Sequence, residues 1–284
     1  MEPSPGEQPF ADFDAFEAST WERQAAGYDG FFPAMTAQAA GPLLDAAAVG
    51  PGARLLDLAT GPGVVARAAV ARGAHVVGLD VAEAMLAIAR VRCPPLGLCR
   101  ADGHHLPFAA GSFDAVTANF AVLHMGRPDD AAAEAAWALV PGGTLAVTVW
   151  GHPEEVAIFD AFQRALAACE APPTAGVPEG PPFFRYSDEA ALTGLLEGAG
   201  LAEVSVTTLA FTHEAADAEQ VWQALVHGTV RTAALVASQG DRLRQAVHDA
   251  FVSELEAHRR GGRLALAAAV RMGTGRAQGR PVEG

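Results

Sequence analysis

Residues 55–65 constrain the fold of this chain more than any other segment does. They read Leu-Leu-Asp-Leu-Ala-Thr-Gly-Pro-Gly-Val-Val, which indicates a buried strand, a glycine-rich turn and the start of a helix. Such a turn brings backbone N–H groups close to a ligand at the N-terminus of the helix. The next apolar run, residues 74–79, is followed directly by Asp80. Together, these two segments predict a site that holds a nucleotide-like cofactor.

Short apolar runs alternate with helical stretches between residues 53 and 150. We expect strands at 54–58, 75–79, 96–100, 113–118 and 144–150, and helices at about 63–72, 82–92 and 129–139. Repeated strand–helix units predict a parallel sheet with helices on both faces and ligands at the carboxyl ends of the strands. The expected fold class is therefore α/β, with a Rossmann-like doubly wound sheet that is mostly parallel and has an antiparallel edge strand.

The rest of the chain is expected to add a lid and a cap to this sheet. We expect an N-terminal helical lid at 1–50 and a cofactor-binding core at 51–150. The end of the core sheet would lie at 151–272, with a helical cap inserted at about 154–186 and 217–258. A disordered tail is expected at 273–284. Strands at 204–211 and 263–271 would pair at the sheet edge, and Ser187 would cap the helix that follows it. In the lid, Phe10, Phe13 and Phe16 recur every three positions, so these rings either anchor a helix to the core or close over a ligand.

Composition excludes several classes of function. The chain has 284 residues and a net charge of −14, and its 19 basic residues are all arginine. Such an acidic chain is poorly suited to nucleic acid, and without lysine it can form no Schiff base. The three cysteines, Cys93, Cys99 and Cys169, indicate reduced thiols, and the apolar run at 264–270 is too short to span a bilayer. Since no signal peptide is evident either, we expect a cytoplasmic protein that binds a small-molecule substrate, neither nucleic acid nor membrane, and that could form a homo-oligomer.

The acids that follow successive strands distinguish between cofactors. The sequence Gly61–Ala66 fits the dinucleotide pattern G-x-G-x-x-A, and Asp80 would suit a ribose. Asp57, however, precedes the turn and would repel a pyrophosphate, whereas it would favour a cation. Asp102 follows the third strand, where a carboxylate would accept a hydrogen bond from an adenine amine. Three acids at one sheet edge therefore favour S-adenosylmethionine over a nicotinamide dinucleotide.

These motifs resemble those of class I S-adenosylmethionine-dependent methyltransferases, of the small-molecule type related to the ubiquinone and menaquinone methyltransferases. The resemblance covers residues 20–150 well and 187–272 in outline. It implies that the methionine part of the cofactor is held by Asp57, Thr60, Gly61 and Gly63. It implies that the ribose is bound by Asp80, with Val81 and Met85 packed nearby, and that the adenine is bound by Asp102 and Gly103. The methyl end would be bordered by Asn119 and Phe120. It also implies that Tyr28 closes over the cofactor. Ala59 departs from the glycine that is common at its position.

His124 is the candidate general base. It follows the fourth strand, and the pKa of an ordinary histidine suits proton removal near neutral pH, although the side chain could instead order its loop. His104 and His105 are adjacent and have no third ligand at a suitable spacing, so no metal site is expected. Four further residues could face a substrate or serve only as structure: Arg185, Tyr186, His213 and His227.

The expected function is methyl transfer to a small, mostly apolar metabolite, such as a natural-product, isoprenoid or quinone-like acceptor. The protein would mainly align the acceptor with the methyl group, and the sequence leaves the methylated atom open. One alternative is a cyclase or rearrangement catalyst that uses bound S-adenosylmethionine without transferring its methyl group. A second is an NAD(P)-dependent oxidoreductase, and a third is a partner-binding module with a vestigial site.

Overall fold

A mixed sheet of eight strands forms the centre of the computed structural model, which describes residues 10–173 and 176–279. The strands are β1 (Arg54–Leu58), β2 (His75–Asp80), β3 (Gly97–Arg100), β4 (Phe113–Asn119), β5 (Leu139–Trp150), β6 (Leu201–Ala215), β7 (Arg259–Arg260) and β8 (Arg263–Ala277). Their order is β3-β2-β1-β4-β5-β8-β6, with β7 paired to β8. Strands β1 to β5 are parallel, and β8 runs antiparallel to β5 and β6. The predicted α/β class is confirmed, and its antiparallel strand lies one place inside the edge strand β6.

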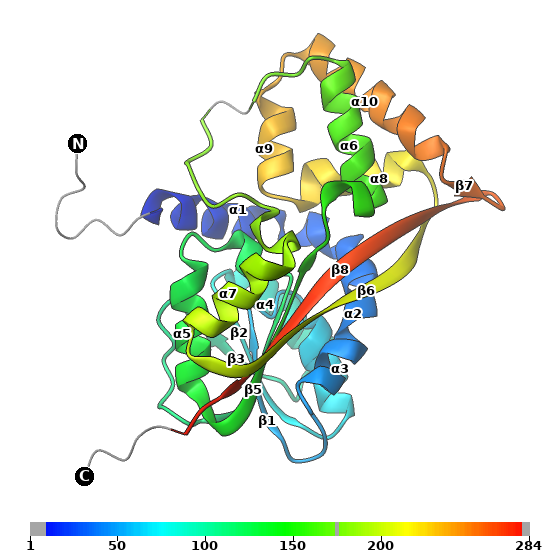
Figure 1. The fold of residues 1–284 in the computed structure, drawn as a ribbon. Coiled ribbons are helices and arrows are strands. Elements are labelled where there is room, and N and C mark those ends of the chain that lie inside the picture. The colour runs from blue at the N-terminus through cyan, green and yellow to red at the C-terminus, as the bar shows by residue number, and fades with distance from the viewer. Residues whose placement is uncertain (1–9, 174–175, 280–284) are drawn as a thin grey trace, which may run out of the picture.

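Helices cover both faces of the sheet and the carboxyl ends of its central strands. They are α1 (Ala11–Asp29), α2 (Phe32–Ala46), α3 (Val64–Ala71), α4 (Glu83–Arg92), α5 (Pro128–Ala138), α6 (Ala157–Ala168), α7 (Glu189–Gly198), α8 (Ala218–Gly228), α9 (Arg231–Ser238) and α10 (Asp241–Glu256), with short 3-10 turns at η1 (Val122–His124), η2 (Pro153–Glu155) and η3 (Arg185–Ser187). In Figure 1, α6, α8, α9 and α10 form a cap above the sheet, and α1 lies between the cap and the strand ends. None of the helices in the described residues is long and apolar enough to cross a membrane.

The central strands are apolar on both faces because helices cover both. Leu55 on β1 packs with Leu44 of α2, whereas its neighbour Leu56 joins the cluster that contains Ala135 of α5 and Leu192 of α7. Successive side chains of a strand point to opposite faces, so a continuous apolar run is what a doubly covered strand requires. This packing fixes the strand ends, and therefore the loops that follow them.

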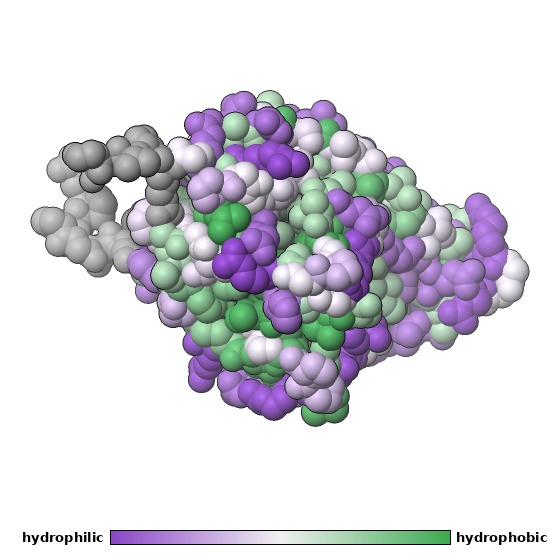
Figure 2. Space-filling model, turned by 90° about the horizontal axis from the view of Figure 1, so that it is seen from below, coloured by the Kyte–Doolittle hydropathy of each residue, from purple (hydrophilic) through white to green (hydrophobic). Residues whose placement is uncertain are grey.

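The last strand is longer than the sequence indicated. The prediction of a disordered tail from residue 273 is wrong for 273–277, which form the end of β8, and residues 280–284 lie outside the described part of the chain. The turn of β7 and β8 projects from the sheet beside the cap (Figure 1), and in Figure 2 this projection is mostly hydrophilic. Its arginines, Arg259, Arg260 and Arg263, account for that polarity.

The cap of α7 also differs from the expectation. Asp188, not Ser187, caps the helix, because its Oδ1 accepts a hydrogen bond from the backbone N–H of Ala191 at 2.9 Å. The Ser187 hydroxyl instead donates to the carbonyl oxygen of Trp150 at 2.9 Å, at the end of β5. Ser187 is therefore a tertiary contact between η3 and the sheet.

Two glycines allow the lid helix α1 to cross the cap helix α8 closely. A Cβ atom at Gly27 would overlap the carbonyl oxygen of His227, and one at Gly228 would lie 2.9 Å from the Cα atom of Tyr28. Only glycine lacks that atom, so the crossing depends on both positions.

We expect Gly27→Ala to push α1 away from α8 and to destabilise the fold by about 1–3 kcal/mol, the usual cost of overpacking. Urea unfolding would measure the change. Gly194→Ala is the matched control, because a Cβ atom at Gly194 in α7 would meet no neighbour, and alanine should there stabilise the helix by roughly 0.5–1 kcal/mol. Equal stabilities for the two variants would contradict the close crossing.

Candidate active site

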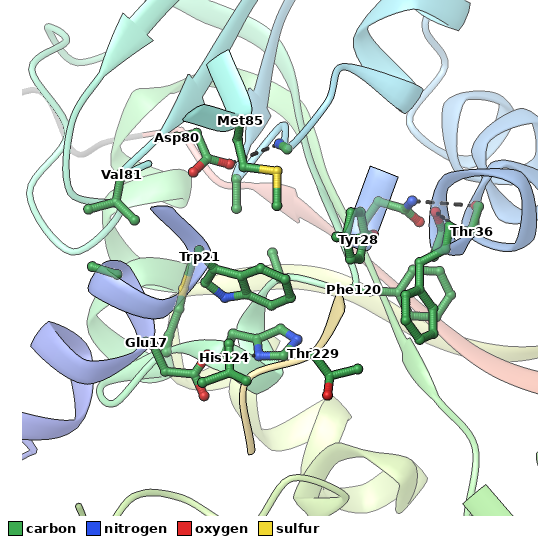
Figure 3. A pocket seen from close by; sticks show the side chains of 18 of the residues that line it. Glu17, Trp21, Tyr28, Thr36, Asp80, Val81, Met85, Phe120, His124 and Thr229 are labelled. Carbon is green, nitrogen blue, oxygen red and sulfur yellow. Dashed lines mark hydrogen bonds and ion pairs between the residues drawn. The ribbon is translucent and has the colours of Figure 1, made fainter. Parts of the chain in front are cut away.

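A cavity of about 610 Å³ lies between the strand ends, the lid and the cap. Every residue predicted for the site lines it except Gly63: Tyr28, Asp57, Thr60, Gly61, Asp80, Val81, Met85, Asp102, Gly103, Asn119, Phe120 and His124. Gly63 instead precedes α3, and its N–H donates to the carbonyl oxygen of Thr60 at 2.9 Å. Figure 3 shows Trp21 of α1 between Asp80 on one side and His124 on the other.

The turn after β1 has a left-handed backbone. Gly61 and Gly63 have φ angles of 53° and 81°, and Ala59 has a φ of 51°. Glycine adopts such angles freely, whereas each left-handed alanine costs roughly 1–2 kcal/mol. Phe120, directly after β4, has a φ of 55°. Non-glycine residues in this region are uncommon, and both of these line the cavity.

Asp57 ties the glycine turn to the sheet. Its carboxylate accepts hydrogen bonds from the hydroxyls of Thr60 and Thr117, at 2.6 and 2.9 Å, and from the N–H of Ala66 at 3.1 Å. Burial raises the pKa of Asp57 to about 6 despite these donors. The structure thus gives Asp57 a positioning role, and its contact with a cofactor stays a prediction.

Asp80 braces the other side of the turn. One carboxylate oxygen accepts from the N–H of Gly61 at 2.8 Å and the other from the N–H of Ala82 at 2.9 Å. Burial raises the pKa of this carboxyl to about 6. Met85 of α4 lies close to Asp80, as Figure 3 shows. Buried carboxylates without a cation partner are costly, which makes this edge of the cavity favourable for a positively charged ligand.

Asp102 is bound to the loop that follows it. Its Oδ1 accepts from the backbone N–H of His104 at 2.9 Å and lies 2.7 Å from Nδ1 of the same residue. This interaction holds the pKa of Asp102 well below its usual range. The His104 ring is buried in the cavity wall, and within the described residues its Nε2 has no hydrogen-bond partner. From the sequence, His104 is considered only as a possible metal ligand, and it is not among the predicted site residues.

The end of β4 is fixed by β5. The Thr148 hydroxyl donates to Oδ1 of Asn119 at 2.6 Å, and the N–H of Phe120 donates to the carbonyl oxygen of Thr148 at 3.0 Å. The Phe120 ring lies 4.1 Å from the ring of Trp150. Tyr28 faces this region from the lid, and burial raises its pKa to about 12, so its hydroxyl keeps its proton. These contacts give the polar and aromatic end of β4 one fixed arrangement.

His124 stands on the rim of the cavity and is held by the lid. Its Nδ1 lies 3.1 Å from Oε2 of Glu17, and the edges of the Trp21 and Phe183 rings pack around it. Glu17 is not among the site residues predicted from the sequence. The available signal was its spacing, because Phe13, Glu17 and Trp21 are four residues apart and so share the inward face of a helix.

The wall opposite the strand ends is apolar and comes from the cap. It includes Phe159, Leu166, Phe183, Phe184, Val230 and Leu235. None of the four residues that could have faced a substrate lines this cavity: His213 packs on the ring of Phe31, Tyr186 is buried elsewhere, and Arg185 and His227 also lie outside the lining. Among the described residues, no cluster of three His, Cys, Asp or Glu side chains could hold a metal ion.

Known proteins are similar to this chain in sequence over part of its length and in fold. Residues 56–147 match the methyltransferase domain family. A demethylmenaquinone methyltransferase from Renibacterium salmoninarum is 38% identical over 111 residues, which are 39% of this chain and 47% of that protein. The Mycobacterium tuberculosis protein Rv1405c is 34% identical over 55% of this chain and 57% of its own length. The chain spans about half the length of the curated relatives it matches.

Solved structures share the fold. The YcgJ protein of Bacillus subtilis has a TM-score of 0.54 at 16% identity and covers 86% of this chain and 99% of its own. A SAM-dependent methyltransferase from Thermotoga maritima, TM1293, has a TM-score of 0.53 at 14% identity, covering 92% and 99%. Residues 56–147 thus match a methyltransferase domain family, and over part of its length the chain is similar to demethylmenaquinone methyltransferases.

Proposed function

We propose that this chain transfers the methyl group of S-adenosylmethionine to a small, mostly apolar metabolite of natural-product, isoprenoid or quinone-like kind. The observation that carries the proposal is a single cavity with two unlike ends. Buried acids and the glycine turn form one end, and aromatic side chains with His124 form the other. We also propose that the protein works in the cytoplasm and, because its net charge is −14, without a nucleic-acid partner.

The residues at the strand ends fit the cofactor. Asp57 and Asp80 are buried carboxylates, and the arginine in the cavity lining, Arg231, is bound to Glu17 on the opposite side. A ligand with positive charge would therefore meet carboxylates that no arginine in the lining neutralises, which disfavours a pyrophosphate and with it the NAD(P) alternative.

Each predicted contact then has a role. Asp80 would accept hydrogen bonds from ribose hydroxyls, and Val81 and Met85 would pack beside the nucleoside. The loop at Asp102 and Gly103 would hold the adenine. The Thr60–Gly61 turn would bind the methionine part.

The chemistry needs little else from the protein. S-adenosylmethionine supplies an already activated methyl group when it is bound. Asn119 and Phe120 border the place where the cap and the strand ends meet, and the apolar wall would exclude water and orient an acceptor there. Because the matched domain is a methyltransferase domain and the relative from Renibacterium salmoninarum is a methyltransferase, a cyclase that keeps the methyl group is not favoured.

A direct assay tests this function. The full chain is incubated with S-adenosylmethionine and a panel of quinols, isoprenoid alcohols and polyketide phenols, and the products are analysed by mass spectrometry. We expect S-adenosylhomocysteine to appear together with a methylated acceptor. An acceptor that is converted without S-adenosylhomocysteine would show the rearrangement alternative, and absence of S-adenosylmethionine binding would refute the proposal.

Cofactor affinity should depend on pH. Burial raises the pKa values of Asp57 and Asp80 to about 6. A positively charged ligand bound beside them stabilises the ionised carboxylates. Affinity should therefore rise as pH increases from about 5 to about 7 and then level off, with protons released on binding near pH 6. Calorimetry in two buffers of different ionisation enthalpy measures this release. A flat affinity across this range would contradict the expectation.

A further inference from the structure

Glu17 is a buried acid inside the lid helix, and its two carboxylate oxygens have different partners. Oε2 lies 3.1 Å from Nδ1 of His124, and Oε1 accepts from Nε of Arg231 at 3.1 Å. The Glu17 side chain is 4% exposed. A buried carboxylate that contacts two basic groups is held in one position. Glu17 thus joins the lid, the rim of the cavity and the cap.

Arg231 contacts Glu17 through Nε, and the rest of its guanidinium group is held by other parts of the protein. Its other two guanidinium nitrogens donate to the carbonyl oxygens of Pro181 and Leu123, at 2.7 and 2.9 Å. The guanidinium also lies over the ring of Phe13, 4.5 Å from its centre. Each of the three guanidinium nitrogens therefore has a protein partner, which fixes the position of Arg231 beside Glu17. Its positive charge balances the negative charge of Glu17 at this end of the cavity.

The hydrogen bond to Glu17 determines the tautomer of His124. A carboxylate accepts only, so Nδ1 carries the hydrogen and Nε2 of the neutral ring keeps its lone pair. Within the described residues, Nε2 has no hydrogen-bond partner. The His124 side chain is 22% exposed and lines the cavity. In Figure 3 its ring lies between Glu17 and Thr229, on the side of Trp21 away from Asp80.

We propose that Glu17 positions His124 as a base for an apolar aromatic acceptor with a phenol-type hydroxyl, which the enzyme methylates on oxygen. This inference rests on the proposed function and names its substrate class. The hydroxyl oxygen attacks the methyl carbon, the bond from that carbon to sulfur breaks, and the sulfonium becomes a thioether. The hydroxyl proton passes to Nε2 of His124 and then to water, while Glu17 stays ionised and stabilises the imidazolium.

The surroundings favour a phenol over an amine. A basic amine is protonated near neutral pH and is stabilised by a carboxylate that has no other cation beside it. Glu17 already forms an ion pair with Arg231 and would stabilise such an amine less. A phenol ionises near pH 10, within reach of an imidazole base. The aromatic wall of Phe159, Phe183 and Phe184 suits a flat neutral ring.

The first test measures the position of the imidazole directly. Nitrogen NMR of the full chain with labelled histidines, assigned with His124→Gln, should show the Nδ1–H tautomer at His124. Glu17→Gln should give a mixture of the two tautomers, because an amide side chain can either donate to Nδ1 or accept from it. Glu17 contacts the ring and Arg231 lies behind it, Asp14 and His104 also line the cavity, and the aromatic neighbours of the ring, Trp21 and Phe183, are uncharged. An Nε2–H tautomer in the parent protein would overturn the proposal.

The second test measures transfer to 1-naphthol and to 1-naphthylmethylamine, which carries a basic amine on the same ring system. We expect methylation of the naphthol only, and about a 100-fold lower kcat in Glu17→Gln with S-adenosylmethionine affinity kept. Transfer to the amine that is insensitive to Glu17, or no methylation of either probe, would overturn the acceptor class.

Two complications, unfolding of the Glu17→Gln variant and absence of cofactor binding, can be separated from a failure of this proposal. If Glu17→Gln unfolds because Arg231 loses its partner, the double variant Glu17→Gln with Arg231→Gln removes both charges and takes its place in both tests. If S-adenosylmethionine does not bind at all, the proposed function fails while the NMR result on His124 still stands. The failure of one proposal is therefore distinguishable from the failure of the other.

Discussion

Replacing Asp80 by alanine is expected to weaken S-adenosylmethionine binding by about 100-fold or more. The carboxylate would accept hydrogen bonds from the ribose, and each hydrogen bond to a charged group contributes roughly 1.5–3 kcal/mol. The variant also frees the N–H groups of Gly61 and Ala82, which Asp80 now holds at 2.8 and 2.9 Å. Calorimetric titration with S-adenosylmethionine measures the loss.

Asp114→Ala is the matched control for Asp80→Ala. Asp114 lies near the start of β4, at the opposite end of the sheet, where it forms an exposed ion pair of 2.6 Å with Arg54. Exposed ion pairs contribute little, so this variant should bind the cofactor like the parent. If both variants bind like the parent, the cofactor does not occupy the end of β2.

Asp57→Ala is expected to destabilise the fold by about 3 kcal/mol, because it leaves buried donors on Thr60, Ala66 and Thr117 without their acceptor. Urea unfolding measures the change. Thr117→Val is the graded comparison, since it removes one of the three hydrogen bonds and should cost about 1 kcal/mol. A loss no larger for Asp57→Ala than for Thr117→Val would contradict the role of Asp57 in holding the turn.

The same substitution has a pH signature. Burial raises the pKa of Asp57 from its usual value of 3.8 to about 6. Between these values the folded chain binds more protons than the unfolded chain, so stability falls as pH rises from about 4 to about 6. Asp57→Ala should lose this share of the pH dependence, while Asp80, whose pKa is also raised to about 6, retains its own.

The strand ends could be predicted because their signal is local. An apolar run leads into an acid at Asp57 and again at Asp80, and a glycine turn follows Asp57 within a few residues. Parallel strands bring their carboxyl ends to one edge, so the position in the sequence implied the position in space. The family resemblance then added Tyr28 and Asn119, which line the same cavity.

The partners of His124 could not be predicted in the same way. Glu17 lies 107 residues before it and Arg231 lies 107 residues after it. Their meeting depends on how the lid and the cap cross, and no local pattern records that crossing. The sequence could place Glu17 on the inward face of a helix, but it could not identify His124 or Arg231 as its partners.

The end of β8 was missed for a related reason. The segment after residue 272 contains glycine and polar residues, which indicates a loop when it is considered alone. In the structure, a Cβ atom at Gly273 would lie 2.9 Å from the Leu196 side chain of α7. Glycine is therefore needed where the helix packs on the strand, a tertiary constraint that local propensity does not contain.

A crystal structure of the full chain with S-adenosylhomocysteine tests the central claim most directly. We expect the adenine beside Asp102 and Gly103, the ribose hydroxyls on Asp80, and the sulfur facing Asn119 with open cavity between it and His124. The same ligand bound outside this cavity, or a cavity that stays empty at saturating ligand, would contradict the assignment of these strand ends to the cofactor.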